Sequence, residues 1–181
     1  MSAAKVKAVV FDGLGVFFGE TVYVDKTNGE VQRTRSHVDG QGISLLRAAG
    51  LRIAFITSEK EGFFEPIVEK LNNLPSVKEG RWPAVALFMG EAGKNKSATI
   101  DAWLKESAIA WDECAYMGDD LGDYEIMQKV GYAAAPAQAE EVIKNIARFV
   151  TARRGGDGAI RDFANHILKE KDINPTTLSL K

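Results

Sequence analysis

The chain has 181 residues, of which 45% are hydrophobic and 27% are charged, and its formal net charge at pH 7 is -2. This composition is typical of a folded globular protein and excludes a disordered or fibrous chain. Because the net charge leaves no basic footprint, we expect no nucleic-acid partner.

The first predicted element is a buried strand from Val6 to Phe11, an apolar and β-branched run that is interrupted only by Lys7 and ends at Asp12-Gly13. This apolar segment is too short for a signal-peptide core or a membrane span. We therefore expect a cytoplasmic protein with no membrane partner.

Residues 16–38 differ from the rest of the chain, because Thr21 to Val24 and Glu30 to Arg35 flank the turn signal Thr27-Asn28-Gly29. This pattern predicts a β-hairpin inserted after the first strand, with Phe17-Phe18-Gly19 at its start. Its exposed edges and aromatic side chains would need covering, so we interpret the hairpin as a contact between subunits.

Two further strands, Ala54 to Ile56 and Ala115 to Met117, alternate with stretches of helical pattern. The helical stretches are 42–49, 63–71 and 96–106. Alternating strands and helices predict an α/β fold of three layers, with a parallel sheet between helices and with ligands at the carboxyl ends of the strands.

The rest of the chain is predicted to be irregular. Residues 74–83 are rich in Pro, Lys, Glu and Gly and predict a surface loop, and residues 173–181 predict a flexible tail. The single cysteine, Cys114, lies in an apolar run and is expected to pack in the core. We therefore expect one domain over residues 1–172.

Polar residues follow each of the three predicted strands: Asp12-Gly13, Thr57-Ser58 and Gly118-Asp119-Asp120. Asp119, Asp120 and Asp123 stand close together, and three clustered carboxylates repel one another unless a cation lies between them. Carboxylate oxygens with water are ligands that suit Mg²⁺.

Four segments of the chain together resemble the haloacid dehalogenase superfamily. They are Val9-Val10-Phe11-Asp12-Gly13-Leu14-Gly15-Val16, Phe55-Ile56-Thr57-Ser58-Glu59-Lys60, Asn95-Lys96-Ser97 and Tyr116-Met117-Gly118-Asp119-Asp120-Leu121-Gly122-Asp123. The resemblance covers nearly the whole chain and is strongest to the capless, tetrameric branch that removes phosphate from 3-deoxy-octulosonate 8-phosphate and from nonulosonate 9-phosphates. It implies a Rossmann-like fold without a cap domain, a homotetramer and a Mg²⁺ cofactor.

The resemblance also implies roles for individual residues. Asp12 falls on the position of the nucleophile that forms an aspartyl-phosphate, Thr57 on that of a hydroxyl donor to phosphate, and Lys96 on that of a charge-neutralising lysine. The implied metal ligands are Asp12, Asp119 and the backbone carbonyl of Leu14. Asp120 and Asp123 would support the metal from nearby.

One position departs from the family. The family has a second aspartate where this chain has Leu14, so the residue that protonates the leaving oxygen and later activates water is absent. General acid-base help contributes roughly a hundredfold to ten-thousandfold to a rate. Leu14 therefore predicts slow hydrolysis.

Two other segments bear on the substrate. The pair Glu59-Lys60, next to Ser58, resembles the nonulosonate enzymes more than the octulosonate enzymes, which implies a nine-carbon keto-acid phosphate. The segment Arg153-Arg154-Gly155-Gly156-Asp157-Gly158-Ala159 resembles a glycine-rich family segment that lies near an adjacent subunit's active site. The expected substrate-binding residues are therefore Ser58, Glu59, Lys60, Arg153 and Arg154. A surface Glu-Lys pair and a plain glycine-rich turn explain the same residues equally well.

Two functional hypotheses remain open. The first is a Mg²⁺-dependent phosphatase acting on a keto-deoxy sugar acid phosphate. The second is a catalytically impaired tetramerisation or binding module, associated with sialic-acid or other acylneuraminate cytidylyltransferase function. Leu14 favours the module, whereas Asp12, Thr57, Lys96 and Asp119 favour the enzyme.

Overall fold

A parallel sheet of six strands lies at the centre of the protein, with the order β5-β4-β1-β6-β7-β8. The computed structural model describes residues 2–60 and 62–180, so residues 1 and 181, the outer ends of the predicted domain and tail, lie outside the described residues. The strands are β1 (Ala8–Asp12), β4 (Arg52–Ile56), β5 (Val85–Phe88), β6 (Cys114–Met117), β7 (Tyr132–Ala135) and β8 (Phe149–Val150). This sheet confirms the predicted α/β class.

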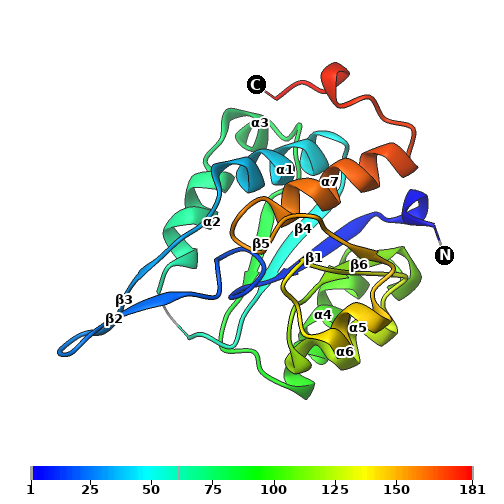
Figure 1. Cartoon of the computed structure of the whole chain (residues 1–181). Coiled ribbons are helices and arrows are strands. Elements are labelled where there is room, and N and C mark those ends of the chain that lie inside the picture. Colours follow the sequence, from blue (N-terminus) through cyan, green and yellow to red (C-terminus); the bar gives the residue numbers. More distant parts are fainter. Residues whose placement is uncertain (1, 61, 181) are drawn as a thin grey trace.

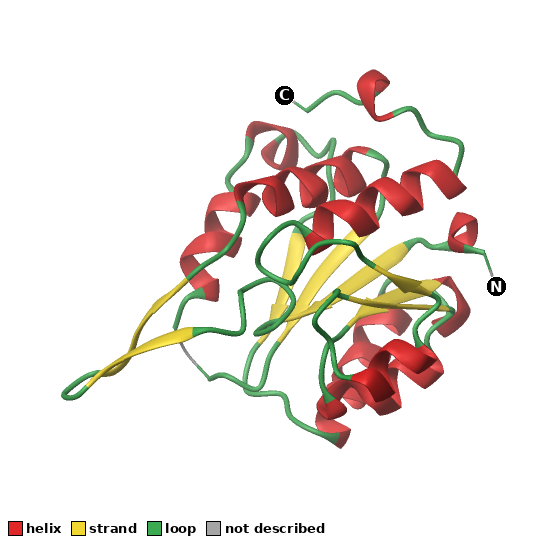
Figure 2. Cartoon of the chain, in the orientation of Figure 1, coloured by secondary structure: helices red, strands yellow, loops and turns green. Residues whose placement is uncertain are grey.

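Helices cover both faces of the sheet (Figures 1 and 2). The α-helices are α1 (His37–Ala48), α2 (Phe64–Asn72), α3 (Pro75–Lys78), α4 (Lys94–Glu106), α5 (Tyr124–Lys129), α6 (Glu141–Ile146) and α7 (Ala159–Glu170). Short 3-10 helices cover Ala3–Lys5, Trp111–Glu113, Leu121–Asp123 and Pro175–Thr177. Figure 1 shows α1, α2 and α7 on one face and α4, α5 and α6 on the other. The predicted three-layer arrangement is therefore confirmed.

The alternation of side chains along the strands divides the hydrophobic core in two. Along β1, Val9 and Phe11 pack toward the face of α1 and α7, whereas Ala8 and Val10 pack toward the face of α4. Residues on successive positions of a strand point to opposite faces. Because both faces are covered, β1 is apolar throughout and becomes polar only at Asp12, its last residue.

The aromatic pair after β1 is placed differently from the expectation. Phe17 and Phe18 are 1% and 2% exposed, and their rings pack against Phe64 with centroids 5.5 Å and 4.8 Å away. They belong to the core and not to an exposed hairpin, because the chain folds back under α2 before the hairpin starts. The prediction of exposed aromatics at 17–18 was wrong.

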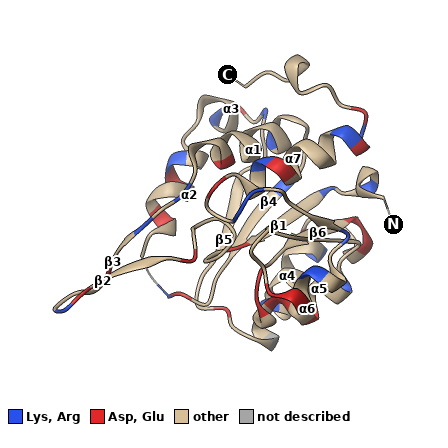
Figure 3. Cartoon of the chain, viewed as in Figure 1, with Lys and Arg blue, Asp and Glu red and all other residues tan. Residues whose placement is uncertain are grey.

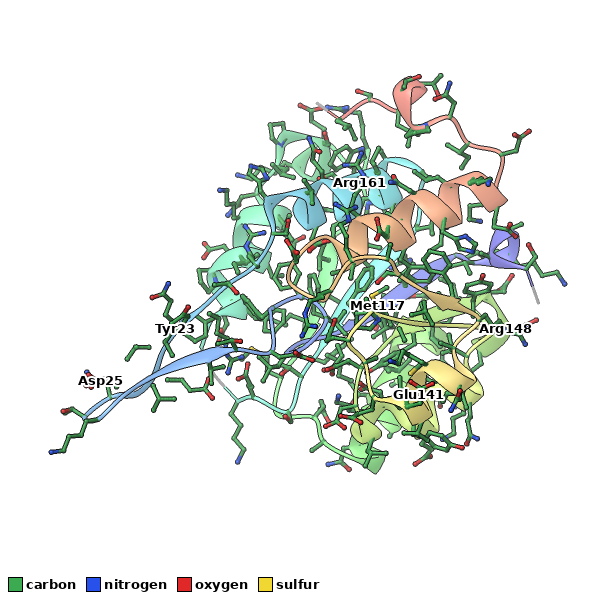
Figure 4. All side chains as sticks on the ribbon, in the orientation of Figure 1. Tyr23, Asp25, Met117, Glu141, Arg148 and Arg161 are labelled. Atoms are coloured by element: carbon green, nitrogen blue, oxygen red, sulfur yellow. The ribbon has the colours of Figure 1, made fainter. Side chains whose placement is uncertain are left out.

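The hairpin itself is formed by β2 (Val22–Asp25) and β3 (Gly29–Arg33), which pair antiparallel. Asp25 Oδ1 accepts hydrogen bonds from the backbone N–H groups of Thr27 (2.8 Å) and Asn28 (3.0 Å), which closes the turn. Figure 1 shows the hairpin projecting from the body, and Figure 4 shows Tyr23 and Asp25 far out along it. Its position after the first strand is as predicted.

The prediction of a surface loop at 74–83 was also incomplete. It contains α3 and two buried side chains, Ser76 and Trp82, and is not simply a surface loop. The guanidinium of the fully buried Arg47 lies 5.6 Å from the Trp82 ring centroid, and its Nε donates to the carbonyl of Pro83 (2.8 Å). Proline at the first turn of α3 explains how a segment of poor periodicity still forms a helix.

The C-terminal part contains α7, which ends at Glu170, and the 3-10 helix Pro175–Thr177. The division at 172–173 into a domain and a flexible tail stays a prediction. Among the helices of the described residues, none has both the length and the apolar character that crossing a bilayer requires.

Candidate active site

The candidate site lies where three neighbouring strands end. Asp12 is the last residue of β1, Thr57 follows β4, and Asp119 comes two residues after β6. Because β4, β1 and β6 are adjacent and parallel, their carboxyl ends meet at one edge of the sheet. A pocket of about 540 Å³ opens there. It is lined by Asp12, Leu14, Gly15, Glu20, Ser58, Ala92, Gly93, Lys96, Asp119, Asp120, Gly122, Asp123, Gln138 and Glu140.

Three carboxylates come together in this pocket. One oxygen atom from each of Asp12, Asp119 and Asp123 lies within 4.8 Å of the others. The spacing in the sequence explains the grouping, because the 3-10 helix Leu121–Asp123 turns the chain back toward the end of β6. We expected Asp123 to support the metal from nearby, and the structure places its carboxylate in the same group as the other two.

Lys96 connects two of the three carboxylates. It lies in the first turn of α4, and its Nζ donates to Asp12 Oδ1 (2.5 Å) and Asp123 Oδ1 (3.1 Å). The side chain is only 8% exposed. Burial alone would lower the pKa of Lys96, but the charges of Asp12 and Asp123 raise it above its ordinary value. Lys96 therefore stays a cation.

Asp123 is held firmly. Its Oδ1 also accepts a hydrogen bond from the buried Tyr116 hydroxyl (2.6 Å), and its Oδ2 accepts one from the backbone N–H of Asp119 (3.1 Å). Burial raises the pKa of Tyr116 well above its ordinary value, so its hydroxyl remains a donor. These bonds fix Asp123 against the backbone that carries Asp119.

Burial and like charges raise the pKa of both remaining carboxyl groups. For Asp12, burial and the charge of Asp123 outweigh Lys96 and raise the pKa to about 7. For Asp119, burial followed by the charges of Asp12 and Asp123 raises the pKa to about 8. A divalent cation among these oxygens would remove the repulsion. The donor set of hard carboxylate oxygens fits Mg²⁺.

The loop after β1 offers one more oxygen donor. The carbonyl of Gly13 accepts hydrogen bonds from Phe17 N and Phe18 N (both 3.0 Å), whereas no backbone hydrogen bond within residues 2–60 and 62–180 reaches the carbonyl of Leu14. Leu14 lines the pocket. Its carbonyl is therefore available to a ligand, and its side chain supplies no acid or base.

The loop also makes a close contact with the carboxylates. A Cβ built on Gly15 would lie 1.9 Å from Asp119 Oδ2, and the φ angle of Gly15 is +84°. Both the contact and the backbone conformation require glycine here. The Asp119 carboxylate thus packs directly against the backbone of the loop that carries Leu14.

Thr57 lies beside this loop with a 3% exposed side chain. Its Oγ1 accepts a hydrogen bond from the backbone N–H of Glu59 (3.3 Å), and a Cβ on Gly13 would lie 2.9 Å from the same oxygen. Because the hydroxyl accepts this bond, its own proton is free to be donated. Thr57 is not among the described residues that line the pocket, whereas its neighbour Ser58 is.

The other predicted site residues are distributed as follows. Asp120 lines the pocket, and its Oδ1 accepts a hydrogen bond from Leu121 N (2.7 Å), which begins the 3-10 helix. Glu59 forms an ion pair with Arg33 of the hairpin. Lys60 is exposed and lies outside the group of residues that line the pocket.

The two arginines before the glycine-rich segment make ion pairs within the chain. Arg153 Nη2 lies 2.7 Å from Asp162 Oδ1, and Arg154 Nη2 lies 2.7 Å from Glu20 Oε2. Arg154 lines a neighbouring pocket of about 370 Å³ that shares Glu20 with the first. Within this chain, the structure does not bring Arg153 together with Asp12 and Lys96.

Sequence reasoning missed three pocket residues with polar side chains: Glu20, Gln138 and Glu140. Glu140 N donates to the carbonyl of Asp119 (2.9 Å), which ties the start of α6 to the metal-binding candidates. Their sequence surroundings carry no motif, and only the order β1-β6-β7 of the sheet brings them to this edge. The strand order could not be read from three recognised strands.

The pocket is strongly acidic. Six of the described residues that line it are Asp or Glu, and one is Lys. Figure 3 shows that acidic and basic residues are otherwise spread over the whole molecule, which agrees with the net charge of -2. The acidic character is therefore local to the pocket, as a cation-binding site requires.

Comparison with known proteins gives a consistent result. A family described as haloacid dehalogenase-like hydrolase matches residues 21–161. The 3-deoxy-D-manno-octulosonate 8-phosphate phosphatase KdsC of Salmonella typhi is 30% identical over 166 residues, which are 92% of this chain and 81% of that protein.

Solved structures of phosphatases also resemble this chain. A probable YrbI family phosphatase from Pseudomonas syringae is 31% identical, with a TM-score of 0.78 over 93% of this chain and 88% of that one. The 3-deoxy-D-manno-octulosonate 8-phosphate phosphatase from Yersinia pestis is 26% identical, with a TM-score of 0.78 over 94% of this chain and 84% of that one.

Proposed function

The chain belongs to the haloacid dehalogenase-like hydrolase family, and on this basis we propose that it is a Mg²⁺-dependent phosphatase acting on the phosphate monoester of a keto-deoxy sugar acid. The observation that carries the proposal is the group of Asp12, Asp119 and Asp123 within 4.8 Å of one another, in contact with the buried Lys96. The named activity of the relatives on 3-deoxy-octulosonate 8-phosphate supports the substrate class.

Asp12 is the proposed nucleophile. Its carboxylate oxygen forms a bond to phosphorus while the bond from phosphorus to the sugar oxygen breaks, which gives an aspartyl-phosphate and an alkoxide. Water then attacks the aspartyl-phosphate and releases inorganic phosphate. Lys96 donates to Asp12 Oδ1 and so holds the carboxylate in one orientation.

Lys96 and Thr57 are proposed to bind the phosphoryl oxygens. The Lys96 ammonium stays charged between two carboxylates, and the Thr57 hydroxyl has its proton free to donate. Preorganised donors of this kind stabilise the charge that develops on the transferring group. Asp12, Asp119 and the Leu14 carbonyl would hold Mg²⁺, whose charge would offset the carboxylates and polarise a phosphoryl oxygen.

Leu14 is proposed to make the enzyme slow. The leaving alkoxide needs a proton, and the attacking water must lose one, but the leucine side chain at the pocket wall can do neither. Outside the cluster, three carboxyl groups line the same pocket and could take part of this role: Glu20, Asp120 and Glu140. Asp120 already caps the 3-10 helix, which restrains it.

The decisive experiment is the substitution Leu14→Asp, assayed with Mg²⁺ against octulosonate 8-phosphate and nonulosonate 9-phosphate. We expect slow turnover by the natural chain and a gain of roughly a hundredfold to ten-thousandfold in kcat for Leu14→Asp. Leu14→Asn, which has the same shape without an ionisable group, is the matched control and should not gain.

A second candidate function rests on Leu14 alone. In it, the chain is a tetramerisation or binding module, associated with sialic-acid or other acylneuraminate cytidylyltransferase function, that has lost turnover. The absence of phosphate release from both the natural chain and Leu14→Asp, across both substrates, would favour the module over the phosphatase.

The hairpin supports the proposal of a homotetramer. Its apolar side chains are exposed, with Tyr23 at 53%, Val24 at 70% and Val31 at 47%. An isolated two-stranded sheet is marginally stable in water. Further copies of the chain would cover these side chains and strand edges.

We further propose that the residues expected to bind substrate contact the sugar acid phosphate. Ser58 lines the pocket and can contact the phosphorylated end of the substrate. Glu59 and Lys60 are the basis for preferring a nine-carbon substrate, and Arg153 and Arg154 are proposed to act toward an adjacent subunit. The ratio of kcat/KM for the two sugar acid phosphates tests this preference, because a nonulosonate enzyme must favour the longer substrate.

A further inference from the structure

Gln138 joins two loops at the wall of the pocket. It follows β7, and its side chain is half-buried among the pocket residues. Its Nε2 donates to the carbonyl of Gly15 (2.6 Å), and its Oε1 accepts from the backbone N–H of Gly155 (2.8 Å). A single side-chain amide therefore bonds both to the loop after β1 and to the glycine-rich segment before α7.

The two loops also touch each other directly. A Cβ built on Gly155 would lie 1.8 Å from the carbonyl oxygen of Gly15, and one on Gly156 would lie 2.2 Å from the backbone nitrogen of Gly19. Gly156 N also donates to the carbonyl of Val16 (2.9 Å). The contact is backbone against backbone, which only glycine permits. This accounts for the glycine-rich segment by its packing within one chain.

The result is a fixed backbone on both sides of Leu14. The carbonyls of Gly13, Gly15 and Val16 all accept hydrogen bonds, and Gln138 supplies the one to Gly15. The carbonyl of Leu14 is the one in this stretch that accepts no hydrogen bond from the described residues. Holding its neighbours determines where this carbonyl points.

The same loop sets the place of Asp119. Its Oδ2 lies so close to Gly15 that a Cβ there would come within 1.9 Å of it. Any shift of Gly15 therefore alters the position of this carboxylate as well as that of the Leu14 carbonyl. Through its hydrogen bond to Gly15, Gln138 therefore affects the positions of both the Asp119 carboxylate and the Leu14 carbonyl. It does so from outside the group of three carboxylates.

We propose that Gln138 is a positioning residue for the divalent-cation site: together with Gly155 it clamps the Leu14-Gly15 backbone so that the Leu14 carbonyl and the Asp119 carboxylate face one cation. The inference rests on the proposed function, since it assigns these two groups to Mg²⁺. It adds a residue that neither touches the reacting atoms nor belongs to the four family segments.

The substitution Gln138→Met tests the clamp. Methionine has a similar length and volume but makes neither hydrogen bond. We expect the dissociation constant for Mg²⁺, measured by calorimetry on the substrate-free protein, to rise by roughly tenfold, as two lost hydrogen bonds allow. We also expect kcat to fall at subsaturating Mg²⁺ and to recover in part at high Mg²⁺, with KM for the substrate near its natural value.

A second variant and a matched control are measured together with Gln138→Met. Gly155→Ala leaves Gln138 intact but pushes a methyl group toward the Gly15 carbonyl, so it should weaken Mg²⁺ binding in the same way. Gln128→Met is the control, because Gln128 is exposed on α5 and its amide donates to Tyr124 (3.2 Å), away from the pocket. It should bind Mg²⁺ as the natural chain does.

Circular dichroism and thermal unfolding establish that each variant is folded, and if one of the two fails to fold, the other carries the test. Folded Gln138→Met or Gly155→Ala protein with the natural Mg²⁺ affinity would overturn the inference and leave the proposed phosphatase standing. Weakened Mg²⁺ binding in a protein without turnover would support the clamp and count against the phosphatase. A natural chain that binds no Mg²⁺ would overturn both.

Discussion

Lys96 does two things at once in the pocket, because the same ammonium group contacts Asp12 and Asp123. With its charge in place, it opposes the rise in the pKa of Asp12 that burial and Asp123 cause. It is also the one lysine among the described residues that line the pocket. Its loss should therefore affect the chemistry more than the fold.

We predict that Lys96→Met lowers kcat by roughly a hundredfold to a thousandfold, because a preorganised charge at the transferring group is lost. Steady-state kinetics on a sugar acid phosphate measures the effect. Lys129→Met is the matched control, since Lys129 pairs with Glu125 on α5 (2.6 Å) outside the pocket. Equal losses in the two variants would contradict a role for Lys96 in the reaction.

The residue scale also shows what a sequence can and cannot reveal. Asp12 and Asp119 were found because each follows a recognisable strand, whereas Lys96 was found through the family resemblance. The grouping of Asp123 with them depends on one turn of 3-10 helix, which the carboxylate spacing suggested only in outline. Glu20 and Gln138 had no local signal, because their place in the pocket arises from contacts between loops distant in sequence.

At the scale of elements, the sequence predicted the three central strands and missed the outer ones. β7 reads Tyr-Ala-Ala-Ala, and alanine has a low strand propensity. β8 has two residues, which is too short for any periodic pattern. Helix α1 starts at His37, five residues before the expected start at Gly42, because two glycines obscured its first turn. The sheet forms despite weak local signals because helices bury it on both faces.

The hairpin carries a prediction about assembly. Replacing Val24 with Lys puts a charge where the most exposed large apolar side chain of the described residues stands. Burial of a valine contributes about 1.5–3 kcal/mol, so the association constant should fall by at least roughly tenfold. Sedimentation equilibrium measures the change.

The control for the hairpin is Val142→Lys, on α6, where the side chain is 40% exposed. That substitution should leave the oligomeric state as it is. If Val24→Lys sediments like the natural chain, the hairpin is not an intersubunit contact, and the proposed homotetramer needs another surface.

At the scale of the whole molecule, the acidic pocket couples folding to pH and to cations. The pKa of Asp12 is about 7 and that of Asp119 about 8 in the folded chain, against an ordinary value of 3.8. Raised pKa values mean that the folded state binds more protons than the unfolded state between these limits. The ion-free protein is therefore stabilised at low pH by these groups and loses that stability as pH rises through 7 and 8.

We predict that Mg²⁺ raises the melting temperature more at about pH 8.5 than at about pH 6, because a cation binds the deprotonated carboxylates and protons compete with it. Calorimetric scans with Mg²⁺ and with a chelator, at both pH values, give the four temperatures required. Asp119→Asn should lose most of the difference. Equal gains at both pH values would contradict the assignment of Asp12 and Asp119 to the cation.

The charges in the pocket determine the order in which the metal ion and the phosphate ester bind. Above about pH 8, where Asp12 and Asp119 have lost their protons, six acidic side chains and one lysine line the pocket, so the ion-free protein repels a doubly charged phosphate ester. The ester therefore binds only after the metal ion has bound and has offset the negative charge. Turnover should thus follow a compulsory sequence, metal first and ester second, and an excess of ester that chelates free metal should act as an inhibitor of its own hydrolysis.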